Sequence, residues 1–291
     1  MSVIATNIGS LRAANASTSA SNALSTAMER LSTGKRINSA KDDAAGLAIS
    51  ASMTSQIKGM NQGIRNANDG ISMAQTAEGA LDEVGNMLQR MRELEVQKTN
   101  GTYSTEDKAN IKTEQDALAS QVGNVLANTK FNGIPLFTGT GGTTGDVKIQ
   151  AGPESGDAIT LKLGVSLKAD YVPANGATAA SGGLGSIIDF TTVQAAPTIK
   201  AAGTLDDYDN AISMVATRRA SLGATQNQLQ SAVNNLTSNS TNLSDAKSRI
   251  EDADFSAETT ALAKAQILSQ ASTAMLAQAN QSQQGVLKLL Q

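Results

Sequence analysis

The sequence contains no histidine, no cysteine and no tryptophan. Histidine is the most common general base and a frequent metal ligand, while cysteine supplies thiol nucleophiles, metal ligands and disulfides. The absence of both residues removes the usual components of an active site or a metal centre, so we predict an enzyme activity, a cofactor and a metal to be absent. Missing cysteine does not assign a compartment, because cytosolic and exported chains can both do without it.

The sequence also lacks a large excess of charge of one sign, and it lacks long apolar runs. The chain has 23 basic and 26 acidic residues, which gives a formal net charge of −3. This balance predicts no binding to nucleic acid or to an anionic membrane. No run approaches the length of a membrane span, and residues 1–20 lack the apolar core of a cleavable secretory signal. We therefore expect a soluble chain, or one exported by a route that needs neither feature.

Proline is confined to the middle of the chain. All four prolines and 13 of the 25 glycines fall between Gly133 and Gly203. Outside that stretch, long helices can run without a proline to break them. Inside it, apolar and polar residues alternate at 147–150 and 159–163, which predicts a β-hairpin. Residues 171–203 are rich in glycine, alanine, serine and threonine, and are predicted to form a small surface insert with at most short strands.

A regular heptad repeat is the strongest positive feature of the sequence. Apolar residues recur at a spacing of seven along one stretch: Tyr208, Val215, Leu222, Leu229, Leu236, Leu243 and Ile250. Such spacing predicts one long helix with a narrow apolar seam that packs against partner helices. Because the positions between these anchors are of mixed polarity, we expect the partners to be other helices of the same chain.

Two further helices are predicted before the proline-containing region. The first runs from residue 44 to about residue 98, with Asp42 or Asp43 as its N-cap. Its apolar residues step by three and four, with a break in phase near Glu78. The second begins after Ser104 or Thr105, either of which can cap it, and runs to about residue 129.

The two ends of the chain share a helical period, many small residues and no proline. Their larger apolar residues are sparse: Ile4, Ile8 and Leu11 at one end, and Leu268, Met275, Val286 and Leu290 at the other. We predict that the two terminal helices pair as the chain returns on itself. Stripes this thin hold a lone pair weakly, so we expect both ends to be largely disordered in the monomer and to fold when further copies bury the stripes.

The predicted fold is therefore mainly α, a long coiled-coil-like helical rod built from both halves of the chain. Residues 1–43 and 251–291 form the paired terminal helices. Residues 44–170 and 204–250 form the rod with its β-hairpin, and residues 171–203 form a small variable surface insert, so the middle of the chain is a small β-containing insert.

Several stretches resemble bacterial flagellin. Near the N-terminus these are residues 29–34 (ERLSTG), 36–46 (RINSAKDDAAG) and 65–70 (RNANDG). The C-terminal half adds residues 222–227 (LGATQN), 248–255 (SRIEDADF) and 274–281 (AMLAQANQ). The resemblance covers roughly residues 1–165 and 204–291. It departs from the family at Gln228, where arginine is frequent, and at Gln283, where many members have proline.

The resemblance implies a structural subunit that polymerises into the bacterial flagellar filament for motility. It also implies export by the flagellar type III apparatus, so that the subunit is secreted and ends in the extracellular flagellum. Implied partners are further copies of the chain, the flagellar cap and hook-junction proteins, and an export chaperone that binds the C-terminal region. The terminal helices would form the inner tube, with the seven sparse apolar residues above packing its core.

One set of residues resembles the patch that the flagellin-sensing Toll-like receptor of animals detects: Arg90, Glu93, Leu94 and Glu114. By residue pattern alone, the same residues fit an ordinary solvated or inter-subunit helix face.

Two other functions fit part of the residue pattern. A chemoreceptor signalling module also has alanine-rich and glutamine-rich heptads, but it should lack a proline-containing and glycine-containing β insert. A hydrolytic enzyme carried in the insert would have to build its site from serine, threonine, aspartate and lysine. Both stay open at the level of residue pattern.

Overall fold

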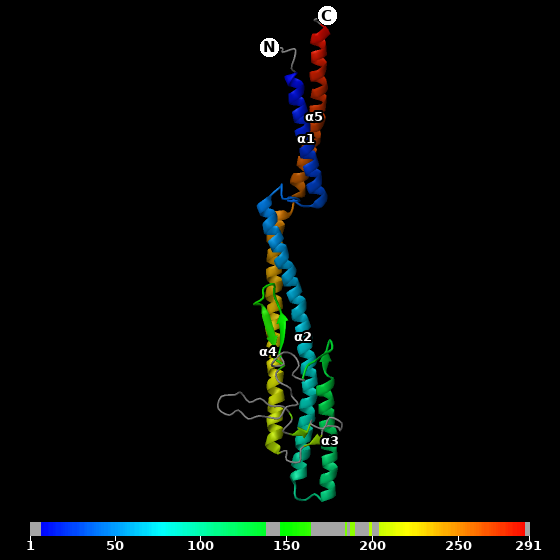
Figure 1. Ribbon diagram of the computed structural model, residues 1–291, viewed down its shortest axis with the longest axis vertical. Coiled ribbons are helices and arrows are strands. Elements are labelled where there is room, and N and C mark those ends of the chain that lie inside the picture. The colour runs from blue at the N-terminus through cyan, green and yellow to red at the C-terminus, as the bar shows by residue number, and fades with distance from the viewer. Residues whose placement is uncertain are drawn as a thin grey trace. The chain divides into compact units, whose positions relative to one another are not determined.

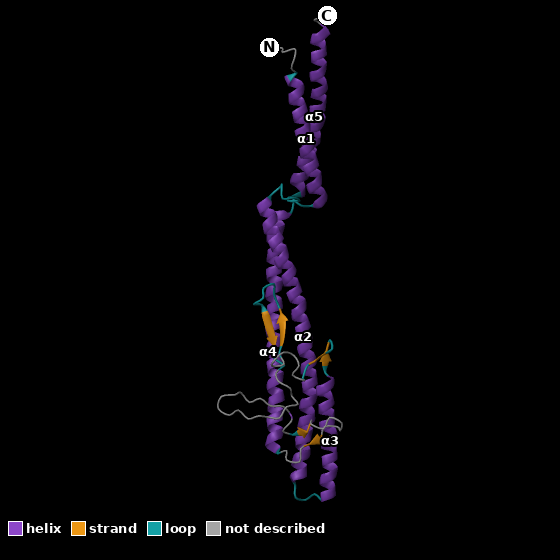
Figure 2. Ribbon diagram, viewed as in Figure 1, coloured by secondary structure: helices purple, strands orange, loops and turns teal. Residues whose placement is uncertain are grey.

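The computed structural model describes residues 7–137, 146–163, 184, 187–189, 198–199 and 204–288. These residues form five helices (Figure 1): α1 (Ile8–Thr33), α2 (Ala44–Thr99), α3 (Thr105–Asn128), α4 (Leu205–Glu251) and α5 (Phe255–Lys288). The remaining regular structure consists of short antiparallel strand pairs (Figure 2). The mainly α fold predicted from the sequence is confirmed, as are the paired terminal helices and the small β-containing middle region.

The chain divides into two compact units. One unit contains residues 1–57 and 241–291, and the other contains residues 58–240. Helices α2 and α4 each contribute to both units, so the border lies inside these helices. The domain boundaries proposed from the sequence lie instead at the ends of α2 and α4, where helix gives way to loop.

The predicted helix caps are present. The Asp43 carboxylate accepts a hydrogen bond from the Gly46 amide at 2.8 Å and caps the first turn of α2. Ser104 caps α3, because its hydroxyl accepts from the Asp107 amide at 3.1 Å and the Asp107 carboxylate accepts from the Ser104 amide at 3.1 Å. This reciprocal pair satisfies two amides that the helix itself leaves free. The hydrogen bonds from Ser104 also lower the pKa of Asp107.

The buried face of α2 corrects one prediction, the break in phase near Glu78. Buried positions alternate in steps of three and four without interruption: Met60, Gly63, Ala67, Gly70, Ala74, Ala77, Leu81, Val84, Leu88 and Met91. The apparent break arose because glycine and alanine occupy several buried positions, and a search for large apolar residues does not register them. The seam is continuous, and its first half is built from small side chains.

The heptad of α4 packs against α2 within the unit formed by residues 58–240. Tyr208, Val215, Leu222 and Leu229 are all buried in one core cluster with residues of α2 and α3. That cluster extends no further along α4 than Leu229. Leu236 is only half-buried, and so are Leu243 and Ile250, which belong to the other unit. The seven heptad positions therefore share a period, but the core covers only the first four of them fully.

The predicted hairpin is formed by β3 (Val147–Gln150) and β4 (Ala158–Leu161), which are antiparallel with Val147 opposite Leu161. Glycines on α2 allow this hairpin to approach the helix backbone. A β-carbon added at Gly63 would lie 2.5 Å from the Ala151 carbonyl oxygen. One added at Gly70 would lie 2.3 Å from Ile149 Cδ1. The Asn66 side chain donates to the Gln150 carbonyl at 3.0 Å and fixes the hairpin on the same face.

Gly63→Ala is expected to destabilise the protein by about 1–3 kcal/mol, because the added methyl group meets backbone that cannot easily move. Gly79→Ala on the same helix is the matched control, since a β-carbon there meets no atom within 4 Å. The control should be neutral or stabilising by up to about 1 kcal/mol, because alanine favours a helix over glycine. Urea unfolding midpoints measure both effects, and a shift of both variants in the same direction would contradict the packing described here.

Two shorter hairpins complete the described strands. β1 (Lys130–Phe131) pairs with β2 (Ile134–Pro135), and the turn residues Asn132 and Gly133 have φ angles of 47° and 79°. An Asn-Gly turn with two positive φ angles suits the twist of a tight hairpin. No alternation of apolar and polar residues predicts this hairpin. β5 (Ile188–Asp189) pairs with β6 (Thr198–Ile199) inside the predicted insert, where short strands were expected.

Candidate functional site

The terminal helices α1 and α5 lie side by side, and small residues line the face along which they meet (Figure 1). On α1 the covered positions are Ser10, Ala13, Ser17, Ala20, Leu24, Ala27 and Leu31. On α5 they are Glu258, Leu262, Ala265, Ser269, Ser272, Leu276 and Ala279. Both sets alternate in steps of three and four, which is the spacing of a two-helix coiled-coil seam. Alanine and serine allow the two helices to approach closely.

Seven larger apolar side chains of α1 and α5 point away from this seam, whereas four leucines lie within it. Those that are mostly or largely exposed are Ile8, Leu11 and Met28 on α1, and Phe255, Ile267, Leu268 and Met275 on α5. Phe255 is 68% exposed and Met275 is 64% exposed. Of the residues predicted to pack a filament core, Ile8, Leu11, Leu268 and Met275 therefore lie on the outer face of the pair. Ile4 and Leu290, and the side chain of Val286, lie outside the described residues.

Exposure of these larger side chains to water costs free energy. Exposed phenylalanine, isoleucine, leucine and methionine on one helix pair leave apolar surface in water, which is unfavourable by roughly 25 cal/mol for each Å². Helices of a self-contained globule usually turn such residues inward. Here the inward positions are filled by small residues and a few leucines, so the outward apolar residues are available to another molecule.

A second feature, which the sequence pattern does not predict, links the C-terminal end of α1 to the N-terminal end of α5. Residues 34–37 and 250–253, which we call the clasp, run antiparallel and meet in a β-bridge between Lys35 and Asp252. The Arg36 amide donates to the Glu251 carbonyl at 2.7 Å, and the Ala253 amide donates to the Gly34 carbonyl at 3.0 Å. Gly34 ends α1 with a φ of 71°, a conformation that favours glycine.

Side chains reinforce the clasp. The Arg36 guanidinium donates to the Ile250 carbonyl at 2.6 Å. Ile37 is buried, and a β-carbon at Gly46 would lie 2.7 Å from Ile37 Cδ1. Residues that follow α1 are thereby held against the first turn of α2.

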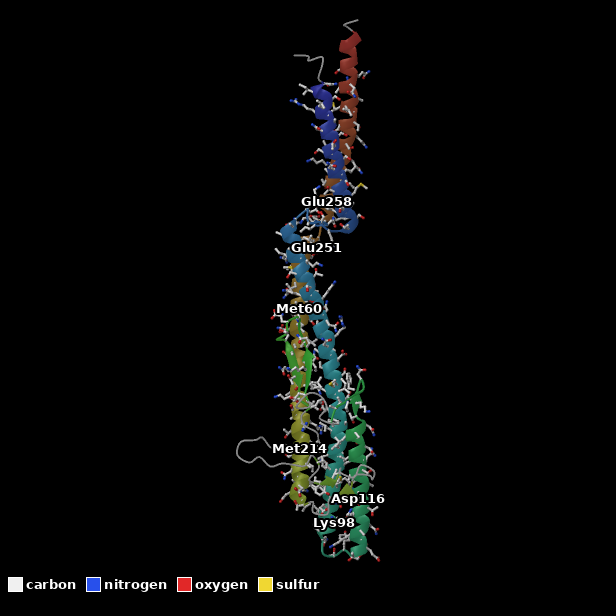
Figure 3. The ribbon with its side chains drawn as sticks, in the orientation of Figure 1. Met60, Lys98, Asp116, Met214, Glu251 and Glu258 are labelled. Carbon is white, nitrogen blue, oxygen red and sulfur yellow. The ribbon has the colours of Figure 1, made fainter. Side chains whose placement is uncertain are left out.

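The Glu251 carboxylate is the electrostatic centre of the clasp, and Figure 3 labels it at the base of the helix pair. It forms ion pairs with Lys35 and with Lys247, the latter at 3.5 Å between Nζ and Oε2. Glu251 is only 6% exposed. The hydrogen bond from Lys35 is the main cause that lowers the pKa of Glu251, and Lys247 adds to it against the opposing effect of burial. The same contact with Glu251 raises the pKa of Lys35.

The residues that resemble a receptor-binding patch lie on α2 and α3. The Arg90 guanidinium donates to Glu114 at 2.9 Å and to Glu93 at 3.2 Å, and all three side chains are exposed. These two carboxylates raise the pKa of Arg90, with Glu114 as the larger cause. Leu94 differs from the other three, because it is 2% exposed and faces the protein interior. The surface of this patch therefore consists of the charged residues.

Side chains that could form a catalytic or metal-binding site are sparse in the part of the chain that the structure describes. No three acidic residues there gather in a way that could hold a metal ion. Among the same residues, no helix combines the length and the apolar character needed to cross a membrane. The features that remain are surfaces and contacts between helices.

Comparison with known proteins identifies the family. The model of the bacterial flagellin N-terminal helical region matches residues 4–141, and that of the C-terminal helical region matches residues 205–290. A flagellin of Halalkalibacterium halodurans is 45% identical over 264 residues, which cover 91% of this chain and 90% of that protein. This chain belongs to the flagellin family. A flagellin of Bacillus subtilis is 41% identical, with 98% of each chain covered, and flagellin C of Vibrio cholerae is 36% identical at the same coverage.

Among solved structures, the crystal structure of Bacillus cereus flagellin is similar, with 28% identity and a TM-score of 0.44. The match covers 63% of this chain and 94% of that one.

Flagellins are structural proteins that self-assemble into the extracellular flagellar filament, and this chain is accordingly a structural subunit and not an enzyme. Membership of the family removes the two alternatives left open by the residue pattern, a chemoreceptor signalling module and a hydrolase in the insert. The matched regions contain all five described helices, and they include both the clasp and the helix pair.

Proposed function

We propose that the α1–α5 pair forms the inner tube of the filament, where the outward apolar residues of each subunit are buried by neighbouring copies. The observation that carries this proposal is the separation of the two faces, with small residues such as Ala20 and Ala265 inside the pair and Leu11 and Met275 outside it. Head-to-tail contacts between such copies generate a helical polymer when their rotation does not close a ring.

The proposal extends to the route and the partners of assembly. The subunit is exported through the growing flagellum by the type III apparatus and is secreted to the tip, where it polymerises beneath the cap and beyond the hook-junction proteins. An export chaperone covers the C-terminal region before that. The sequence supports this order, because the outer faces of α1 and α5 would associate prematurely if they stayed uncovered in the cell.

Electron microscopy of purified protein after addition of short filament seeds tests the proposal. Long tubular filaments are expected. Protein that remains monomeric, or that forms only amorphous aggregates under conditions in which the seeds persist, would contradict it.

We also propose that the exposed charged residues at Arg90, Glu93 and Glu114 contact the flagellin-sensing Toll-like receptor. Arg90→Ala combined with Glu114→Ala should weaken signalling by the monomer in a cell reporter assay. The variant should remain folded, because an exposed ion pair contributes only about 0–1 kcal/mol.

The matched control for this double variant is Arg219→Ala combined with Asp82→Ala. That pair also joins two helices through an arginine and a carboxylate, at 2.8 Å, and is about as exposed. Loss of signalling in both double variants, or in neither, would show that the Arg90–Glu114 surface is not the determinant.

A further inference from the structure

The face along which α1 and α5 meet leaves their register weakly defined. Nine of its fourteen covered positions are alanine or serine, which bury little area and do not interlock as leucine does, and four are leucine. Because both sets of covered positions repeat every seven residues, a slip of one helix by a heptad keeps the same two faces in contact, and only the few leucines in the seam oppose it. A contact outside the seam can therefore contribute strongly to the axial position of the two helices.

The clasp lies where it can fix the axial position of α1 relative to α5. α1 ends at Thr33, directly before Gly34, and α5 begins at Phe255, two residues after Ala253. The hydrogen bond from the Ala253 amide to the Gly34 carbonyl, at 3.0 Å, therefore ties the end of one helix to the start of the other. Asp254 then caps α5 through the Ser256 amide at 2.8 Å.

Other contacts along the pair agree with this register but are weaker. The Asn7 side chain donates to the Ala279 carbonyl at 3.2 Å near the far end. Arg30 Nη1 lies 3.9 Å from Glu258 Oε2 near the base. A single side-chain hydrogen bond and a long ion pair at partly exposed positions do not fix a helix pair by themselves.

We propose that Glu251 is a positioning residue for self-assembly, which latches the clasp and thereby holds α1 and α5 in the one register that aligns their outward apolar residues for a neighbouring copy. This inference rests on the proposed role of the helix pair in the filament. Glu251 acts through both of its parts, since its carbonyl accepts from the Arg36 amide and its carboxylate holds Lys35 and Lys247.

The charges around Glu251 favour a closed latch at neutral pH. Lys35 approaches the carboxylate from the segment after α1, and Lys247 approaches from the preceding turn of α4. Asp252 also acts on Lys35, and the Arg36 guanidinium is engaged by the Ile250 carbonyl. Because the pKa of Glu251 is lowered from its ordinary value of 4.5, its contribution is present above that pH and is lost as the pH falls through the lowered value.

Glu251→Gln tests the latch, because glutamine keeps the shape of the side chain and removes the charge. In the full-length monomer, hydrogen exchange of the Arg36 and Ala253 amides should become about tenfold faster, since hydrogen bonds to charged groups are the strong ones. The concentration of subunit needed for seeded assembly should rise by a similar factor, about tenfold.

Asp245→Asn is the matched control. Asp245 pairs with Arg249 at 2.9 Å on the same helix with the same four-residue spacing, but the two side chains are 62% and 78% exposed. Exchange at the clasp and the assembly concentration should both stay at the wild-type values in this variant.

The pH profile separates a latch from a general loss of packing. The ratio of clasp exchange rates between Glu251→Gln and wild type should fall to one as the pH drops through the pKa of Glu251, because the wild-type carboxylate is then neutral as well. A ratio that stays constant over this range would overturn the electrostatic latch.

The outcomes distinguish this inference from the proposed function. Wild-type protein that fails to extend seeds contradicts the proposed function, while exchange at the clasp still reports on the latch. Wild-type filaments together with unchanged assembly of Glu251→Gln would overturn the positioning role, whether or not clasp exchange is faster.

Discussion

Removal of residues 1–40, or of residues 255–291, is expected to abolish polymerisation while the remaining helices stay folded. The first deletion removes α1, and the second removes α5 from its first residue onward. Either one destroys the helix pair and takes away three or four of its seven outward apolar residues. The main core cluster extends from Ala67 to Leu229, so all of its members lie between the deleted segments.

Sedimentation and electron microscopy after seeding measure assembly of the two truncated proteins, and circular dichroism measures their remaining helix. Filaments formed by either truncation would contradict the role given to the ends. Loss of the helical signal of α2, α3 and α4 would instead show that the ends are needed for folding of the 58–240 unit.

The same helix pair is expected to become fully ordered only when the subunit assembles. Its seam of alanine and serine buries little apolar area, so the entropy lost in ordering two long helices is poorly offset in a lone subunit. Amide hydrogen exchange should be fast along α1 and α5 in the dilute monomer, while the clasp stays protected, and slow along both helices in the filament. Strong protection of both ends in the monomer would contradict folding coupled to assembly.

Leu229→Asp is expected to destabilise the protein by about 3–5 kcal/mol, because it places an unpaired carboxylate in the core. Leu229 is fully buried, and a β-carbon at Gly70 would lie only 3.2 Å from its Cδ1. Little space is therefore available for water to follow the new charge. Urea unfolding of the wild type and the variant measures the difference.

Gln230→Asp is the control for this substitution. Gln230 is exposed and adjacent in the same helix, so both variants bear the same low helix propensity of aspartate. The control should change stability by only about 0.5 kcal/mol or less. Equal midpoints for the two variants would contradict the assignment of the heptad to the buried seam.

Much of the architecture was predictable because local signals were strong. The long helices were recognised from their period and from the position of the prolines, and Asp43 and Ser104 marked two helix starts through their capping chemistry. The hairpin at 147–161 was predictable from the alternation of apolar and polar residues along its strands. The family was identified from motifs of six to eleven residues, which are specific without any three-dimensional information.

Other features depended on which surfaces meet. Gly63 and Gly70 lie in the buried seam of α2, yet their role appears only when the hairpin is packed against them. Leu94 belongs to a surface patch by resemblance and to the interior by structure. The Asn132–Gly133 hairpin was missed because its strands are two residues long and give no alternating pattern.

The sequence by itself determined the helices, their caps, the family and the absence of the residues from which active sites are usually built. Tertiary structure decided which side of each terminal helix faces inward, because the period of a helix gives a stripe but not its partner. It also determined the clasp, where the Arg36 guanidinium donates a hydrogen bond to the Ile250 carbonyl, 214 residues away in the sequence. Backbone hydrogen bonds between segments so far apart depend on the path of the whole chain, and no local pattern encodes that path.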